Sequence, residues 1–172
     1  MAGIANPRQE RIEVYKFNPF IVAGVVLAAL VMQAWLPTKI HFFGAFDLPL
    51  IVTIYFAVAR RSQVSGCLTG AVIGLLQDSL ANQPLGIFGI AKSIVGYGAS
   101  SLGAKVDVEN PGSRLLMVAG FYLVHDAIFL AIARGLVKMD RPWFWGHEIR
   151  NAAANAVLAL VIFAILDKFK QK

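Results

Sequence analysis

Residues 66–97 read GCLTGAVIGLLQDSLANQPLGIFGIAKSIVGY. Two runs of apolar and small residues flank a short turn, and each run carries one charged residue, Asp78 or Lys92. Small residues spaced four apart let two helices approach closely in lipid, where water provides no hydrophobic drive for helix association. The stretch therefore predicts a helical hairpin inside a membrane, with two charges whose role has to be explained.

The composition of the whole chain agrees with a membrane location. Of its 172 residues, 58% are hydrophobic and 15% are charged, and the mean hydropathy is +0.65. A soluble domain is far more polar. The apolar runs lack the alternation of a transmembrane β-barrel strand. We predict an all-α polytopic membrane protein whose residues 1–172 form a single membrane domain.

Six apolar runs are candidates for crossing the membrane, since a helix needs about 20 residues to traverse the hydrocarbon core. They lie at about 20–36, 46–59, 64–80, 85–104, 115–137 and 149–166. The second run is short and has Asp47 and Pro49 at its start, so a re-entrant or strongly tilted helix is an alternative there. If the second run did not cross the membrane, five spans would remain and the basic tail would lie outside, against the positive-inside rule.

Basic residues predict the orientation of the bundle. With the N-terminus inside, the inner segments carry ten Lys and Arg residues and the outer segments carry three. This bias satisfies the positive-inside rule and makes 1–18 and 167–172 cytoplasmic. The start of the chain also resembles a secretory signal, but no convincing small-x-small cleavage site follows, so we interpret 20–36 as a retained span. The net charge of +6 thus reflects topology and predicts no nucleic-acid site.

Small residues mark the faces on which the third and fourth runs are expected to pack. The pattern consists of Gly66, Gly70 and Gly74 on one helix and Gly89, Ser93 and Gly96 on the next. Such stripes occur in membrane proteins of every function. They therefore predict architecture and indicate no activity.

Asp78 and Lys92 fall at similar distances from the turn and could pair across the hairpin. An unpaired charge deep in the bilayer costs about 3 kcal/mol or more, which favours pairing. Alternatively, Asp78 meets water at a helix end and Lys92 reaches outward to the interface. We predict that both belong to a buried polar network that locks the hairpin, and its other expected members are Asp126, Arg150 and Asn155.

Asp126 and its neighbour His125 lie near the middle of the fifth run, and Arg150 and Asn155 lie in the outer half of the sixth. Adjacent residues on a helix point about 100° apart, so Asp126 would not readily orient His125 as a catalytic base. Charges of both signs are nearly balanced in these spans. That balance favours a hydrogen-bonded network over a pathway for one ion sign.

No known catalytic motif or phosphate loop occurs in the sequence. His41, His125 and His147 are far apart and lack metal-ligand spacing. The single cysteine, Cys67, has no intrachain partner. We therefore expect no enzymatic activity, no cofactor and no metal ion.

Between the fifth and sixth runs, four residues form a candidate docking segment: Arg141, Trp143, Phe144 and Trp145. Aromatic residues at this position are typical of the belt at a membrane interface. Trp and Arg are also frequent anchors of protein interfaces, which makes docking of an extracytoplasmic partner the alternative.

These features together resemble the bacterial rod shape-determining MreD family. The similarity rests on glycines four apart, then an Asp, a turn with Leu-Gly and a small-residue helix that ends near a Tyr. The matching positions are Asp78, Leu85, Gly86 and Tyr97, with further matches at Gln33, Pro49 and Asp126. The resemblance extends from Gln33 to the basic tail.

The resemblance implies a non-catalytic scaffold subunit of the cell-elongation complex, multi-pass in the bacterial inner membrane. It implies an MreC-type single-span partner and, indirectly, MreB, a RodA-type glycosyltransferase and a class B penicillin-binding protein, with membrane lipid around the bundle. It also implies a six-helix fold similar to the S-component of energy-coupling-factor transporters. A small-molecule-binding subunit of such a transporter is therefore the alternative function, although the chain lacks a long outer lid loop.

Overall fold

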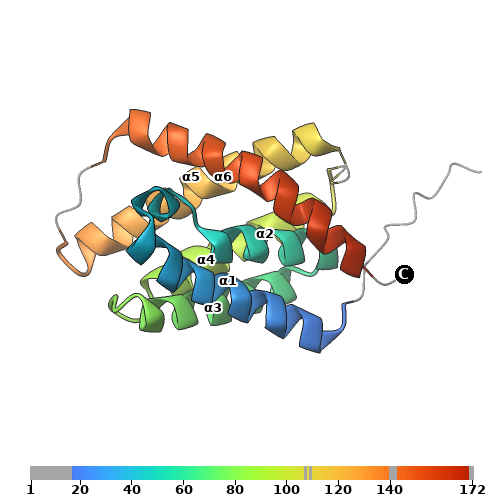
Figure 1. The fold of residues 1–172 in the computed structure, drawn as a ribbon, viewed down its shortest axis with the longest axis horizontal. Helices are drawn as coiled ribbons and strands as arrows, with labels where there is room; N and C mark the ends of the chain where they lie inside the picture. The colour runs from blue at the N-terminus through green and yellow to red at the C-terminus, as the bar shows by residue number, and fades with distance from the viewer. Residues whose placement is uncertain (1–16, 107, 109, 140–142, 171–172) are drawn as a thin grey trace, which may run out of the picture.

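A computed structural model describes residues 17–106, 108, 110–139 and 143–170. These residues form six α helices and two short 3-10 helices. In chain order they are α1 (Pro19–Lys39), η1 (His41–Ala45), α2 (Leu48–Arg60), α3 (Gln63–Leu80), α4 (Ile87–Gly103), α5 (Pro111–Gly135), α6 (Trp145–Leu166) and η2 (Asp167–Phe169). Figure 1 shows α1 beginning and α6 ending at the same end of the bundle.

The helical membrane class predicted from the sequence is confirmed. Within the described residues, three helical segments are long and apolar enough to cross a membrane, namely α1, α5 and Trp145–Phe169. Helix α2 is a shorter apolar helix. Each predicted run overlaps one of the six helices, while the number of crossings and their orientation stay predictions.

Three helices begin in the same way, with a polar cap followed by proline. Asn18, Asp47 and Asn110 accept hydrogen bonds from backbone N–H groups in the first turns of α1, α2 and α5. Proline follows within two positions in each case, where its missing N–H costs nothing. These short Asn or Asp signals place the helix starts inside an otherwise apolar sequence.

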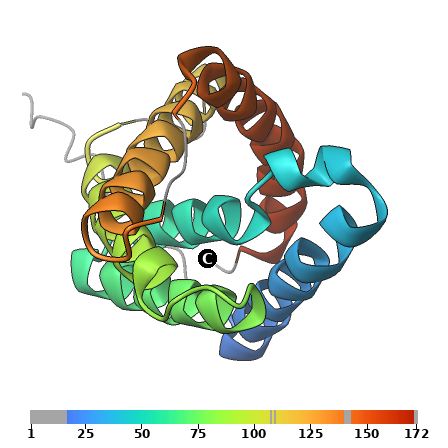
Figure 2. The same ribbon diagram turned by 90° about the vertical axis from the view of Figure 1, so that its left-hand side faces the viewer.

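Helix α2 is the core of the bundle. All residues from Leu48 to Ala59 are buried, and α2 packs against α1, α3, α4, α5 and α6. Figure 2 shows the other helices arranged around it. Its 13 residues extend only about 20 Å. A helix enclosed by protein does not have to match the bilayer thickness, which explains why this apolar run is short.

Helices α3 and α4 lie in backbone contact along the glycine positions. A Cβ atom added at Gly66 would clash with Gly96, and one at Gly70 would clash with the carbonyl of Lys92. At the next turn, Gly74 lies against the backbone of Phe88 and Gly89. The spacing of four thus corresponds to one close contact per helical turn.

Candidate functional site

Asp47 is the acidic member of a buried polar cluster at the start of α2. Its Oδ1 atom caps the helix by accepting a hydrogen bond from the backbone N–H of Leu50 at 2.9 Å. The residue is 9% exposed, so its carboxylate has left water almost completely. A buried carboxylate needs a cationic or hydrogen-bonding partner for its second oxygen.

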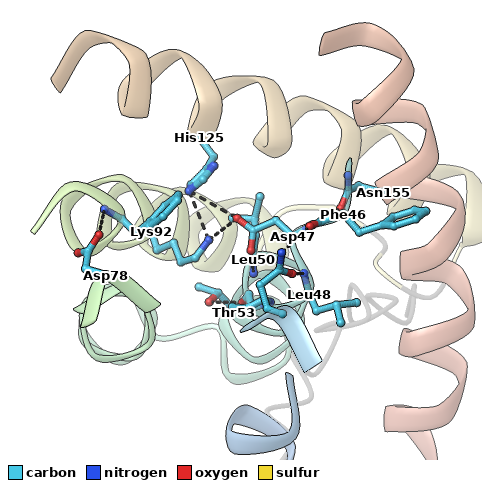
Figure 3. Close-up of polar contacts among 12 residues, drawn as sticks. Phe46, Asp47, Leu48, Leu50, Thr53, Asp78, Lys92, His125 and Asn155 are labelled. Atoms are coloured by element: carbon cyan, nitrogen blue, oxygen red, sulfur yellow. Dashed lines mark hydrogen bonds and ion pairs between the residues drawn. The ribbon is translucent and has the colours of Figure 1, made fainter. Parts of the chain in front are cut away.

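Lys92 provides that partner from α4. Its Nζ atom donates a hydrogen bond to Asp47 Oδ2 at 2.6 Å, and the residue is 0% exposed. The same Nζ lies 3.3 Å from His125 Nε2 and 5.3 Å from the centroid of the Phe88 ring. Figure 3 shows the Lys92 ammonium between the Asp47 carboxylate and the His125 ring. The ion pair thus lies inside the protein, surrounded by further favourable contacts.

His125 completes the cluster from α5 and is 2% exposed. Its Nε2 atom lies 3.9 Å from Asp47 Oδ2, and its ring stacks parallel to Phe88 with centroids 5.8 Å apart. An ammonium group has donors only, so a hydrogen bond from a charged Lys92 requires Nε2 as its acceptor. His125 thus places a ring nitrogen next to both members of the ion pair.

Gln33 on α1 holds the segment that leads into α2. Its Nε2 donates to the carbonyl of Phe46, and its Oε1 accepts from the backbone N–H of Leu48, both at 2.9 Å. The first N–H groups of a helix have no partner within the helix. Gln33 therefore satisfies polar backbone groups that would otherwise be buried without partners.

Asn155 holds the same segment from α6. Its Oδ1 accepts from the backbone N–H of Asp47 at 2.9 Å, and its Nδ2 donates to the carbonyls of Ala45 and Asn151, both at 2.8 Å. The residue is completely buried. Gln33 and Asn155 thus hydrogen-bond the backbone at the start of α2 from two sides. These bonds position Asp47 for its contact with Lys92.

Replacing Asn155 with leucine, which has a similar volume, should lower the free energy of unfolding by about 2–3 kcal/mol. The variant leaves the Asp47 N–H and the Ala45 carbonyl buried without this partner, and each such group costs about 1–3 kcal/mol. Thermal unfolding of the purified protein in detergent measures the change. Val157→Leu, at an exposed position of the same helix, is the control. Equal unfolding temperatures for the two variants would show that the Asn155 hydrogen bonds do not stabilise the protein.

Asp78 has a different task from the one predicted from the sequence. Its carboxylate accepts hydrogen bonds from the backbone N–H groups of Gly86, Phe88 and Gly89 at 2.8, 3.0 and 3.3 Å. A negative charge at this position also complements the dipole of α4. Gly86 has a φ of +104°, a conformation suited to glycine. Asp78 thus shapes the turn of the hairpin and caps α4.

Asp78 and Lys92 therefore do not form a direct pair, although both side chains are completely buried. The Asp78 oxygens are engaged by the α4 N-terminus, whereas Lys92 points from α4 toward the start of α2 (Figure 3). Equal distance from a turn does not make two side chains face each other, because the rotation of each helix decides their direction.

Replacing Asp78 with alanine should lower the free energy of unfolding by about 2 kcal/mol, because three N–H groups lose their acceptor. Asp78→Asn keeps one acceptor oxygen and should lose roughly half as much. Thermal unfolding combined with amide hydrogen exchange at Gly86 and Phe88 measures both effects. Ser79→Ala, in the next position but exposed, is the control. Unchanged exchange at these amides would contradict the capping role.

The two other predicted network members, Arg150 and Asp126, are not completely buried. Arg150 is exposed near the start of α6, about 140° around the helix from Asn155, so its assignment to a buried network was wrong. Asp126 is partly exposed but interacts electrostatically with Lys92, and its neighbour His125 contacts Lys92 directly. Of the five predicted members, Lys92 and Asn155 meet at Asp47, and Asp78 is buried at the hairpin turn.

The candidate docking segment lies at the start of α6. Phe144 and Trp145 are 64% and 67% exposed, and Trp143 is partly exposed. The rings of Trp143 and Trp145 pack edge to face with centroids 5.3 Å apart. Arg141 lies outside the described residues. The described part of the segment is therefore a preformed aromatic surface, whose role stays a prediction.

Sequence reasoning missed Asp47, His125 and Gln33 as parts of the site. Asp47 was noted only as a mark of the short second run, although an Asp that precedes a buried helix by one position signals a cap.

No group of three or more His, Cys, Asp or Glu residues in the described ranges is arranged to hold a metal ion. The interactions that the cluster makes are an ion pair and hydrogen bonds.

The comparison with protein families decides what kind of protein carries this cluster. The family described as rod shape-determining protein MreD matches residues 15–172. The chain belongs to the MreD family. No curated protein and no solved structure matches it. The MreD match includes every residue of the cluster, from Gln33 on α1 to Asn155 on α6, so the cluster lies within the domain that defines this family of shape-determining membrane proteins.

Proposed function

We propose that this MreD family member is a non-catalytic subunit of the bacterial cell-elongation complex. In the inner membrane it binds an MreC-type single-span protein and supports lateral peptidoglycan synthesis. The observation that carries the proposal is the family match over residues 15–172. MreB, a RodA-type glycosyltransferase and a class B penicillin-binding protein are its indirect partners in the same rod-shape complex.

The buried cluster supports a scaffold role. Lys92 and Asp47 neutralise each other. The side-chain amides of Gln33 and Asn155 hydrogen-bond backbone groups at the start of α2. A buried ion pair contributes little net stability but penalises every arrangement in which its partners separate. The cluster therefore favours one arrangement of α1, α2, α4, α5 and α6, as a subunit that presents fixed surfaces requires.

The proposed orientation puts the N-terminus and the basic tail in the cytoplasm, with six crossings. The aromatic segment of Trp143, Phe144 and Trp145 then faces the outer side, where an MreC-type partner emerges from the membrane. Large exposed aromatic side chains near an interface are typical anchors for a partner. This segment is therefore the proposed docking surface.

Affinity purification of the tagged protein from its own membranes in a mild detergent, followed by mass spectrometry, tests the proposal. We expect the MreC-type protein and the peptidoglycan synthases to be recovered. The double variant F144A/W145A should reduce recovery of the MreC-type protein at least tenfold. Trp35→Ala, which removes another exposed aromatic residue, is the control. Loss of recovery in both variants, or in neither, would contradict the proposed surface.

The alternative function, a small-molecule-binding subunit of an energy-coupling-factor-type transporter, is supported by one pocket. A cavity of about 200 Å³ is lined by Gln33, Gln77 and Gln83. In the described part of the chain, the buried Oε1 atoms of Gln77 and Gln83 have no hydrogen-bond partner. Ligand pockets usually measure about 300–1,000 Å³, so this cavity is small for a ligand. Recovery of paired ATPases in the purification would instead establish the transporter subunit.

A further inference from the structure

A groove of about 470 Å³ lies between α1 and α3 on the outside of the bundle. Its walls are apolar and include Val22, Val26 and Leu27 from α1 and Leu68, Val72 and Leu76 from α3. Leu68 and Val72 are more than half exposed, at 61% and 56%. In a membrane, apolar side chains on the outside of a bundle face the hydrocarbon of the bilayer.

Arg60 lies at one end of this groove. It is the last residue of α2, and its Nη1 atom donates to Ser65 Oγ at 3.3 Å. Within the described residues, no carboxylate forms an ion pair with it. A guanidinium group has five N–H donors, and most of those on Arg60 remain available to a ligand. The groove thus combines apolar walls with a cationic end.

We propose that this groove binds one anionic phospholipid, with its phosphate at Arg60 and an acyl chain between α1 and α3. Arginine binds phosphate oxygens through its planar fork of donors, and basic pockets between membrane helices are known to recognise acidic lipid head groups. The proposed orientation places Arg60 in the cytoplasmic leaflet. Binding itself requires only that Arg60 lie at the end of the bundle, as it does.

The groove favours a phospholipid as its occupant, because its apolar walls end at a cation. Along α1 it runs from Pro19 to Leu27, roughly 12 Å at the rise of an α helix. Apolar walls over this length match a stretch of hydrocarbon chain, and the Arg60 guanidinium at the end matches a phosphate.

Native mass spectrometry of the full-length, delipidated protein tests the charge at Arg60. The protein is titrated with phosphatidylglycerol or with phosphatidylcholine of the same acyl chains. We expect one phosphatidylglycerol to bind about fivefold more tightly than phosphatidylcholine, the effect of roughly one favourable basic contact. Arg60→Gln should abolish this preference. Lys105→Gln, an exposed basic residue outside the groove, should leave it unchanged.

A second pair of variants tests the acyl chain. Ala23 lines the groove, whereas Ala28, on the same helix and also exposed, does not. Ala23→Phe should weaken binding of both lipids at least threefold, and Ala28→Phe should not. Millimolar glycerol phosphate, a soluble head group, should not displace the lipid. Thermal unfolding verifies that each variant is folded, and the uncharged Arg60→Met replaces Arg60→Gln if the latter is not.

Several results would overturn the proposal. Equal affinity of the wild-type protein for the two lipids, or an unchanged preference in Arg60→Gln, would show that Arg60 does not recognise the phosphate. Displacement by glycerol phosphate would indicate a small-anion site without an acyl chain. A dimer in the same spectra that Ala23→Phe disrupts would show that a second copy of the chain occupies the groove.

Discussion

Replacing Lys92 with methionine is expected to lower the free energy of unfolding by about 3–5 kcal/mol. Methionine fills nearly the same volume, so the loss is mainly electrostatic. The change leaves the Asp47 carboxylate buried without its cation, and removing one partner of a buried ion pair costs about this much. Urea or thermal unfolding in detergent measures the change. Lys105→Met, at an exposed position, should stay within about 0.5 kcal/mol of the wild type.

The double variant D47N/K92M distinguishes the energy of the ion pair from the effect of lost side-chain packing. Asparagine keeps the cap on α2 but carries no charge, so the double variant should be more stable than Lys92→Met alone. A double variant that is as unstable as the sum of the two single variants would show that the two residues do not interact. If Lys92→Met also leaves recovery of the MreC-type protein unchanged, the cluster is not needed to form the binding surface.

Replacing Gly70 with leucine is expected to separate α3 from α4 and to cost about 3 kcal/mol or more. A Cβ at this position meets the backbone carbonyl of Lys92, which cannot rotate away as a side chain would. Overfilling a packed contact commonly costs 1–3 kcal/mol, and a backbone contact leaves no room for relaxation. The same shift would pull Lys92 away from Asp47. Thermal unfolding and size-exclusion profiles in detergent provide the measurement.

Gly120→Leu is the matched control for this variant. Gly120 also lies within a helix, α5, but a Cβ there meets nothing within 4 Å. Leucine has a better helix propensity than glycine, so the control should be neutral or slightly stabilising. A similar loss in both variants would show that close approach at Gly70 is unimportant. Gly70→Ala should fall between the wild type and Gly70→Leu.

Local patterns predicted much of the architecture. The apolar runs predicted the helices, and the spacing of Gly66, Gly70 and Gly74 predicted the face on which α3 meets α4. Burial of Asp78 and Lys92 followed from the cost of an unpaired charge at depth. These properties depend on residues within one or two helical turns, or on the composition of one run, and can therefore be read from the sequence.

The partner of Lys92 could not be read in this way. Asp47 and His125 lie 45 and 33 positions away from it in the chain, and Asn155 lies 108 positions from Asp47. Which of several buried carboxylates meets the ammonium depends on the rotation and tilt of whole helices. A small change in either moves a side chain by several ångströms, and no local pattern encodes it.

The sequence by itself determined that this is an α-helical membrane protein of the MreD type with a close-packed central hairpin, because hydrophobic runs and small-residue spacing act locally. Only the tertiary structure decided that the short α2 is the core of the bundle and that Lys92 pairs with Asp47 instead of Asp78. The reason is physical: these features arise when five helices pack around a sixth, and side chains far apart in the chain then share one buried space.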